Sequence, residues 1–266
     1  MTFFQVGIAM SMIVLITDFG LDDPYVGQMK GVIYSRFPGA CIVDLTHGVQ
    51  AFNIHQAGFL LACSLDFFPP GAVFIAVIDP GVGSDRGIVL AETRTCWILA
   101  PDNGLLSQAL DAGLLKTCRR FLGNPPSSTT FHGRDIFAPL GANLAEKQSV
   151  PADFEVFDPQ ELVRFCLPAP AACSTGVKCM VLHRDHYGNL VLNLDIDPWA
   201  GRLQEARMRI GGYEMVLVSY YAAIPEGCLG LVTGSQGRLE IAAREYSAAR
   251  LLGLGPGDEV VFSFMD

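Results

Sequence analysis

The sequence predicts an α/β protein of two domains: a three-layer α/β/α domain with a central, mostly parallel sheet, followed by a small all-β barrel. Its length of 266 residues suits two domains. Between residue 13 and about residue 146, short β-branched runs alternate with longer helical patterns, as in βαβ units. Later, short strands separated by turn residues replace that alternation. We therefore expect an N-terminal domain at residues 12–165, a linker at 166–177 and a barrel at 178–266.

The elements of the first domain follow from hydrophobic runs and their spacing. Residues 13–16, 41–45 and 73–78 are almost continuously apolar, which predicts central strands covered on both faces. Residues 25–36 and 53–65 have helical patterns and lie between these strands. Residues 1–11 precede the first strand as an extension with no evident function.

The second domain follows an uncharged segment, residues 165–177, whose Pro168 and Pro170 disfavour both a helix and a central strand. Beyond it, Gly211 and Gly212 are expected to join two strands in a hairpin. The strands expected in this domain are residues 180–183, 190–194, 207–210, 213–218, 229–233, 238–242 and 259–264. Short strands in such number are typical of a small barrel.

Composition and charge exclude several classes of protein. Half of the residues are hydrophobic and 17% are charged, which excludes extended disorder and a coiled coil. Acidic residues outnumber basic ones by 27 to 18, and a net charge of −9 repels phosphate backbones, so no nucleic-acid partner is expected. The uncharged residues 1–17 include Gln5, Gly7 and Ser11 and fall short of the roughly 20 apolar residues of a membrane-spanning helix. They also lack a basic flank, so we expect no membrane association, no signal peptide and a cytoplasmic location.

The eight cysteines are scattered without a C-x-x-C pair, at positions 41, 63, 96, 118, 166, 173, 179 and 228. Most lie within apolar stretches, which favours small, buried, reduced side chains over disulfides or zinc ligands.

Polar residues that follow the predicted strands are the candidates for chemistry, because α/β sheets bind ligands at strand ends. Asp18 follows the first strand, where a carboxylate suits the two hydroxyls of a ribose. Asp22 or Asp23 suits the N-terminus of the helix that Pro24 opens, and we assign Asp22 as its cap.

Two further segments of the first domain bring charged or imidazole side chains next to glycines. Asp79 and Arg86 flank a loop with two glycines that follows the third strand, where they form either part of a ligand site or a structural salt bridge. His132 precedes Gly133 at the entrance of a helical run, where it either meets a ligand or makes a structural hydrogen bond. Neither segment is a phosphate-binding glycine motif.

In the second domain, residues 183–189 form a turn between two strands and allow two interpretations. His183, Asp185 and His186 are residue types that ligate metals, although no further ligand stands at a recognisable spacing. In the other interpretation, Asp185 and Asn189 pair with a purine or ribose, and the Tyr187 ring is a stacking surface.

Six blocks in register give the sequence a resemblance to the S-adenosyl-L-methionine (SAM) hydroxide adenosyltransferase family, the hydrolytic relatives of fluorinase and chlorinase. The blocks are TDFG at 17–20, DPGVG at 79–83, APDNGLL at 100–106, FHGRD at 131–135, DHYGN at 185–189 with Asn193, and GSQG at 234–237 leading into LEIA at 239–242. The resemblance implies an N-terminal α/β domain, a C-terminal barrel, and a homotrimer that binds SAM between the N-terminal domain of one subunit and the C-terminal domain of the next.

The resemblance also implies roles for individual residues. Asp79, Arg86 and His132 stand at the positions of an Asp, Arg, His triad around the attacking water. The expected substrate-binding residues are Asp18 at the ribose hydroxyls, Phe52 against the ligand, Asp185, Tyr187 and Asn189 in the adenosine pocket, and Asp23 and Ser235 at the methionine end. The halogenases have a tyrosine at the Asp79 position and a serine at the Gly133 position.

Two positions depart from the family pattern. Tyr187 replaces the usual phenylalanine and adds a hydroxyl that needs a partner, and Gln236 stands where the halogenases have an arginine near the methionine.

The expected reaction is attack of water on C5′ of the ribose, which releases adenosine and L-methionine without a cofactor or metal. Three alternatives are a SAM-dependent halogenase, a non-catalytic protein that binds adenosine or SAM, and a metal-dependent hydrolase built on His183, Asp185 and His186. A carboxylate at position 79 argues against a halogenase, because it repels a halide anion.

Overall fold

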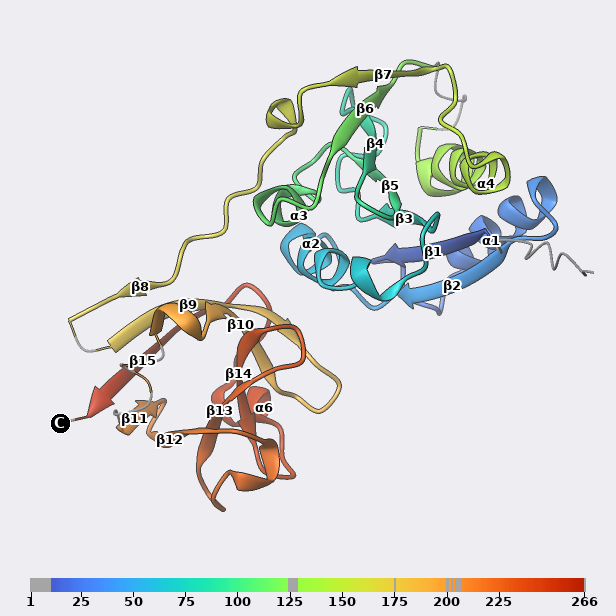
Figure 1. The fold of residues 1–266 in the computed structure, drawn as a ribbon. Coiled ribbons are helices and arrows are strands. Elements are labelled where there is room, and N and C mark those ends of the chain that lie inside the picture. Colours follow the sequence, from blue (N-terminus) through green and yellow to red (C-terminus); the bar gives the residue numbers. More distant parts are fainter. Residues whose placement is uncertain are drawn as a thin grey trace, which may run out of the picture. The chain divides into compact units, whose positions relative to one another are not determined.

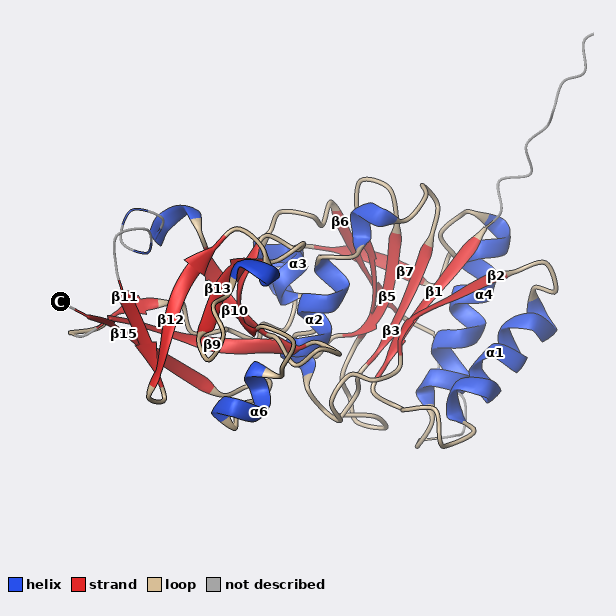
Figure 2. Ribbon diagram, turned by 90° about the horizontal axis from the view of Figure 1, so that it is seen from below, coloured by secondary structure: helices blue, strands red, loops and turns tan. Residues whose placement is uncertain are grey.

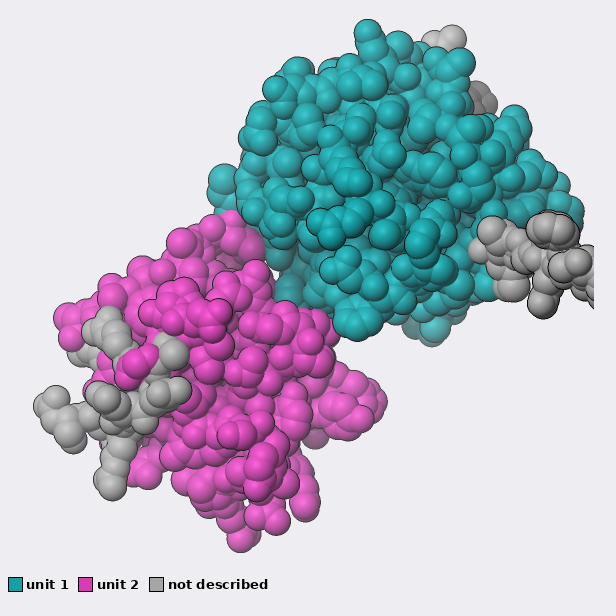
Figure 3. All heavy atoms as spheres, in the orientation of Figure 1, with its two compact units in different colours: residues 1–166 teal, residues 167–266 magenta. Residues whose placement is uncertain are grey.

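The chain divides into two units, Met1–Cys166 and Leu167–Asp266, which Figure 3 colours separately. The computed structural model describes residues 11–123, 129–174, 176–199, 201, 203 and 207–265. Residues 1–10 of the expected N-terminal extension therefore lie outside the described residues.

A seven-stranded sheet forms the centre of the first unit (Figure 1), in the order β2-β1-β3-β5-β4-β6-β7. The pairings β1–β2, β1–β3 and β3–β5 are parallel, and the remaining three are antiparallel. The strands are β1 (Met12–Thr17), β2 (Cys41–Thr46), β3 (Val73–Val77), β4 (Ile88–Glu92), β5 (Trp97–Pro101), β6 (Thr117–Phe121) and β7 (Phe154–Phe157).

Helices cover both faces of this sheet, which confirms the three-layer prediction (Figure 2). Alternate side chains of β1 point to opposite faces: Ile13 and Leu15 join a buried cluster with Met29 of α1, whereas Val14 and Ile16 join a second cluster on the other face. Figure 1 shows α1 beside α4 and α2 beside α3. The helices are α1 (Tyr25–Arg36), α2 (Ile54–Ala62), α3 (Ser107–Asp111) and α4 (Ala138–Lys147).

The ends of the first two helices show where local sequence signals succeed and fail. The α1 helix has the predicted bounds, but the assignment of Asp22 as its cap is wrong: Pro24 occupies the N-cap position and no side chain caps the helix. Asn53 caps α2 by accepting a hydrogen bond from the Gln56 amide, and α2 ends at Ala62, before a 3₁₀ turn at Leu65–Phe67.

The second unit is a barrel of seven strands, closed by the pairing of β9 with β10, which confirms the predicted barrel. The strand β9 pairs with β15 along its first half and with β10 along its second half. The strands are β9 (Gly176–Arg184), β10 (Leu190–Asp195), β11 (Arg207–Ile210), β12 (Tyr213–Val218), β13 (Leu229–Thr233), β14 (Arg238–Ala243) and β15 (Glu259–Met265), and the helix α6 (Ala248–Leu252) follows β14. Within the expected linker, Gly176 and Val177 belong to β9, and β8 (Ala171–Ala172) pairs with it.

The β11–β12 hairpin forms as predicted, with Ile210 opposite Tyr213. Gly211 and Gly212 both have positive φ, at 52° and 86°, as a two-residue turn between twisted strands requires.

Three of the cysteines, Cys96, Cys118 and Cys179, are buried as expected, whereas Cys166 is exposed. Burial raises the pKa of Cys118 to about 11 and that of Cys179 to about 12, so both remain neutral thiols near neutral pH. Among the described residues, no helix has the length and hydropathy needed to cross a membrane.

Candidate active site

Arg86 joins Asp79 and His132, which are far apart in the sequence, into one hydrogen-bonded chain. Its Nε donates to both carboxylate oxygens of Asp79, at 2.8 and 2.9 Å, and its Nη2 also pairs with Oδ2. The same Nη2 lies 2.9 Å from Nδ1 of His132. The Asp79 and Arg86 side chains are only 4% and 8% exposed, so solvent screens this ion pair weakly. The structure thus brings the three expected catalytic residues together.

The loop that holds Asp79 and Arg86 runs from the end of β3 to the start of β4. Two backbone turns fold it, with the Val82 amide bonded to the Asp79 carbonyl and the Ser84 amide to the Gly81 carbonyl. Gly83 has φ +81°, and a Cβ atom there would overlap the backbone oxygen of Thr129, so only glycine fits. The loop is compact enough for residues seven apart in sequence to face each other.

His132 immediately precedes a π-helical turn, Gly133–Phe137, that leads into α4. Single π-helical turns are rare and often occur at functional sites. The imidazole is buried, and Phe137 from the same turn lies under the Arg86 guanidinium, 5.6 Å from its ring centroid. The turn therefore supports both partners of the hydrogen bond.

The tautomer of His132 follows from its partner. A guanidinium has only donors, so Nδ1 of His132 must accept the hydrogen bond from Arg86, and the neutral ring then carries its proton on Nε2. Burial and the Arg86 charge lower the pKa of His132 from the usual value near 6.5, outweighing the opposing charges of Asp79 and Asp135. The imidazole is consequently neutral at neutral pH.

Asp18 and Phe52, both expected to bind the ligand, contact each other. Oδ2 of Asp18 accepts a 2.8 Å hydrogen bond from the backbone amide of Phe52. Burial raises the pKa of Asp18, and the charge of Asp79 adds to the rise. Phe52 has φ +65°, which is rare for a residue other than glycine, and the residue is 71% exposed. This strained position presents an open aromatic surface next to a carboxylate.

Asp23, expected at the methionine end, is exposed in the segment that precedes α1. Nearby in sequence, Phe19 and Tyr25 pack edge to face with Phe131, the neighbour of His132. This aromatic cluster ties the Asp18 loop to the segment that carries His132.

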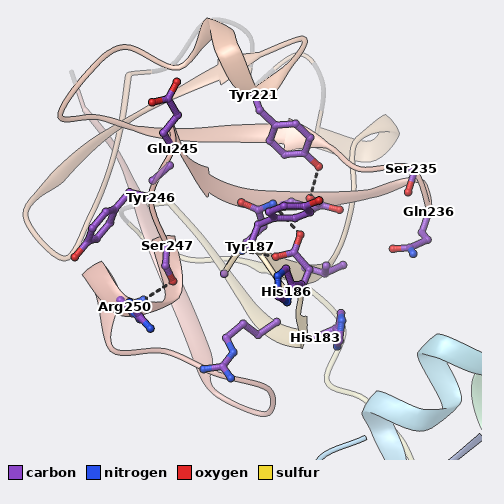
Figure 4. A pocket seen from close by; sticks show the side chains of 17 residues that line it. His183, His186, Tyr187, Tyr221, Ser235, Gln236, Glu245, Tyr246, Ser247 and Arg250 are labelled. Carbon is purple, nitrogen blue, oxygen red and sulfur yellow. Dashed lines mark hydrogen bonds between the residues drawn. The ribbon is translucent and has the colours of Figure 1, made fainter. Parts of the chain in front are cut away.

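The second unit contains a hollow of about 1160 Å³, and its lining includes four of the expected binding residues (Figure 4). They are Asp185, Tyr187, Asn189 and Ser235. The turn between β9 and β10 supplies the first three, and the turn between β13 and β14 supplies Ser235 and Gln236.

Two hydrogen bonds between Asp185 and Asn189 hold the β9–β10 turn together. Oδ1 of Asp185 accepts from the Asn189 amide at 2.7 Å, and Oδ2 accepts from its Nδ2 at 2.8 Å. Asn189 is buried, so its amide orientation is fixed by Asp185. Tyr187 at the tip of the turn is 77% exposed, so its side chain is available for stacking.

Two residues of this hollow, Tyr221 and Glu240, escaped the sequence prediction. The Tyr221 hydroxyl donates a 2.8 Å hydrogen bond to Oε2 of Glu240, a buried carboxyl on β14. Burial raises the pKa of both groups, that of Tyr221 to about 12. The sequence signal that could have indicated Glu240 is its position as a carboxylate between Leu239 and Ile241 in an otherwise apolar strand.

The described residues include no group of three His, Cys, Asp or Glu side chains placed to hold a metal ion, so His183, Asp185 and His186 do not form such a group. Both oxygens of Asp185 are already engaged by Asn189.

The sequence matches two family profiles in the order of its two units. The SAM hydroxide adenosyltransferase N-terminal domain matches residues 13–153, and the SAM hydroxide adenosyltransferase C-terminal domain matches residues 179–261.

Similar proteins carry related names. An (R)-S-adenosyl-L-methionine hydrolase of Thermus thermophilus is 36% identical over 256 residues, which cover 91% of this chain and 95% of that relative. A protein of the same name from Methanocaldococcus jannaschii is 31% identical, covering 94% and 95%, whereas a fluorinase of an Actinoplanes species is 28% identical and covers 68% and 71%. The crystal structure of an uncharacterized conserved protein from Thermotoga maritima superposes with a TM-score of 0.84 at 29% identity, covering 96% of this chain and all of that one.

Proposed function

The chain belongs to the SAM hydroxide adenosyltransferase family, and on that premise we propose that it hydrolyses S-adenosyl-L-methionine to adenosine and L-methionine by attack of water on ribose C5′. The buried hydrogen-bonded chain of Asp79, Arg86 and His132 is the observation that carries this proposal. It gathers an acid, a cation and an imidazole at the carboxyl end of β3, where an α/β sheet binds its ligand.

The chemistry of the substrate explains what such a site has to supply. The sulfonium is a good leaving group and needs no acid, whereas water is a weak nucleophile. Water must lie opposite the C5′–S bond, within about 3 to 3.5 Å of C5′. Hydroxide and sulfonium carry opposite charges that cancel during the attack, so a buried site favours the transition state.

The hydrogen bonds of the triad support a division of roles in the proposed mechanism. His132 cannot accept a proton at Nδ1 while Arg86 donates to it, and its Nε2 carries hydrogen. Asp79 remains as the proton acceptor, and His132 orients the water as a donor through Nε2. The Arg86 cation holds both groups in place and favours the hydroxide form.

We assign the other expected residues to substrate binding, supported by exposed rings and fixed polar groups. Asp18 binds the ribose hydroxyls and Phe52 lies against the ligand. In the second unit, Tyr187 stacks on adenine, while Asp185 and Asn189 line the adenosine pocket. Asp23 and Ser235 reach the methionine end.

We further propose a homotrimer with the site at the subunit interface, and a cytoplasmic location. The resemblance to the family supports the trimer, as does the division of the expected ligand residues between the two units. Light scattering tests the assembly. Mixing unfolded Asp79→Ala and Asn189→Ala chains and refolding them together should restore activity if one site draws residues from two chains; no recovery from trimeric mixtures contradicts the shared site.

The halogenase alternative is disfavoured by two residues. Asp79 would repel a halide at the site of attack, and Gly133 offers no side-chain hydroxyl to hold one.

Product analysis tests the proposed function. Incubation with SAM followed by chromatography should yield adenosine and methionine in equal amounts, and EDTA should not change the rate. A 5′-halo-5′-deoxyadenosine product would identify a halogenase. Bound but unconverted SAM would identify a non-catalytic binding protein, and loss of activity with EDTA would identify a metal-dependent hydrolase.

A further inference from the structure

The carboxyl group of Glu240 is buried in the wall of the hollow in the second unit, with one oxygen unused. The residue is 5% exposed, and Oε2 accepts the hydrogen bond from Tyr221. Among the described residues, none donates a hydrogen bond to Oε1. Oε1 is therefore available to accept a hydrogen bond from a ligand in the hollow.

A second carboxylate near Glu240 favours a cationic ligand in the hollow. Asp185 lies close enough to raise the pKa of Glu240, so two carboxylates share the hollow. Arg184 and Arg250 also line it, but among the described ion pairs neither joins Glu240 or Asp185. A bound positive charge would relieve the repulsion between the two carboxylates.

The position of Glu240 identifies the part of the ligand that it can meet. A Cβ atom on Gly234 would overlap Oε1 of Glu240, so this oxygen lies against the backbone immediately before Ser235. Ser235 is the residue assigned above to the methionine end of the substrate. Figure 4 shows Ser235 and Gln236 on the side of the hollow near Tyr221.

We propose that Oε1 of Glu240 accepts a hydrogen bond from the α-ammonium group of the methionine part of SAM, which makes Glu240 a specificity-determining residue. The ammonium is the one group of SAM that is both cationic and a hydrogen-bond donor. The sulfonium carries no hydrogen, and the adenine amine carries no charge. This inference rests on the proposed function and adds the group that recognises the amino-acid end.

Three ligands separate the possible contacts of Glu240. S-adenosyl-L-homocysteine retains the ammonium and lacks the sulfonium, whereas 5′-methylthioadenosine and adenosine lack both and retain adenine. Isothermal titration of the full-length Glu240→Gln variant should show about ten- to hundredfold weaker binding of S-adenosyl-L-homocysteine, the usual range for a hydrogen bond to a charged group. Binding of the other two ligands should change less than about threefold. With SAM as substrate, KM should rise by about the factor by which the affinity for S-adenosyl-L-homocysteine falls. The value of kcat should stay within about threefold of wild type.

Glu214→Gln is the matched control, because it removes one carboxylate from an exposed position of the same barrel that does not line the hollow. It should leave all affinities unchanged. Equal weakening of all three ligands by Glu240→Gln would show that Glu240 acts on the adenosine part that they share, and weakening of SAM alone would show a sulfonium contact. Either result, or no change at all, overturns the proposal.

Two measurements keep the test decisive. If Glu240→Gln fails to fold, the wild-type protein is titrated with the analogue of S-adenosyl-L-homocysteine in which hydrogen replaces the amino group; unchanged affinity contradicts the ammonium contact, and a tenfold loss supports it. Because S-adenosyl-L-homocysteine binding requires no turnover, a protein that produces no adenosine but shows the predicted pattern would refute the proposed function and retain this inference.

Discussion

Arg86 donates a hydrogen bond of 2.9 Å to Nδ1 of His132, and this bond determines the protonation state of the imidazole. A neutral ring whose Nδ1 accepts carries its proton on Nε2. The same guanidinium binds both oxygens of Asp79. A single cation thus contacts both groups, and the proposed mechanism assigns His132 as the donor to the water and Asp79 as the acceptor of its proton.

The activity should therefore depend on His132 remaining neutral. Its pKa is lowered by burial and by Arg86, so the neutral form persists below the usual value near 6.5. As pH falls through that lowered pKa, Nδ1 becomes protonated and loses the hydrogen bond, and the stability that the neutral ring contributes above pH 6.5 is lost as well. A profile of kcat/KM between about pH 4 and pH 9 should show an acid limb with a midpoint below 6.5. A midpoint above 7, or the same limb in His132→Gln, contradicts this role.

Asp79→Asn should lower kcat by about 10²- to 10⁴-fold, because an amide cannot accept the water proton. The KM for SAM should change less than about threefold, since the substitution preserves shape. Steady-state kinetics measure both parameters. Asp85→Asn, an exposed change in the same loop, is the control and should have wild-type kinetics. A fully active Asp79→Asn enzyme would exclude Asp79 as the base.

Asp18→Ala should act on binding rather than on the chemical step. The change removes both the carboxylate expected at the ribose and the acceptor for the Phe52 amide. Loss of a charged hydrogen bond costs about 1.5 to 3 kcal/mol, which corresponds to roughly 10- to 150-fold weaker binding. Titration with S-adenosyl-L-homocysteine tests this, with the exposed Asp66→Ala as control. Unchanged affinity would remove Asp18 from the binding site.

Gly133→Ser introduces the halogenase residue at this position but should not create a halogenase. A Cβ atom there would lie 3.1 Å from the Phe131 ring and 3.3 Å from Met29 Sδ and from the Phe19 ring, so the aromatic cluster must shift. Overpacking of this kind costs about 1 to 3 kcal/mol, which urea unfolding measures. Gly27→Ser, where a Cβ atom meets nothing within 4 Å, should leave stability almost unchanged. Chloride-dependent formation of 5′-chloro-5′-deoxyadenosine by Gly133→Ser would contradict the expectation.

The sequence predicts the parts of the fold that local patterns control. The α1 helix at Tyr25–Arg36 and the β11–β12 hairpin follow from periodicity and from Gly211-Gly212, and both form as expected. The antiparallel half of the first sheet, from β4 to β7, could not be predicted, because pairing between strands distant in the sequence leaves no local signal. The prediction that Asp22 caps α1 is wrong because Pro24 itself occupies the N-cap position.

The candidate site likewise contains residues that the sequence indicated and residues that only the fold reveals. The sequence indicated Asp79 and Arg86 from the loop after the third strand and His132 from the start of a helical run. Only the fold shows that Arg86 lies between the other two. Tyr221 and Glu240 were missed because their hydrogen bond joins the segment before β13 to β14, and neither residue belongs to a turn motif. Their contribution depends on tertiary packing.

The origin of the oxygen in the product tests the account most directly. SAM is incubated with the enzyme in H₂¹⁸O containing chloride, and the adenosine is analysed by mass spectrometry. Water attack at C5′ predicts one ¹⁸O atom in the 5′-hydroxyl of adenosine and none in methionine. Adenosine without the label, or a 5′-chlorinated nucleoside in its place, would contradict the proposed attack of water.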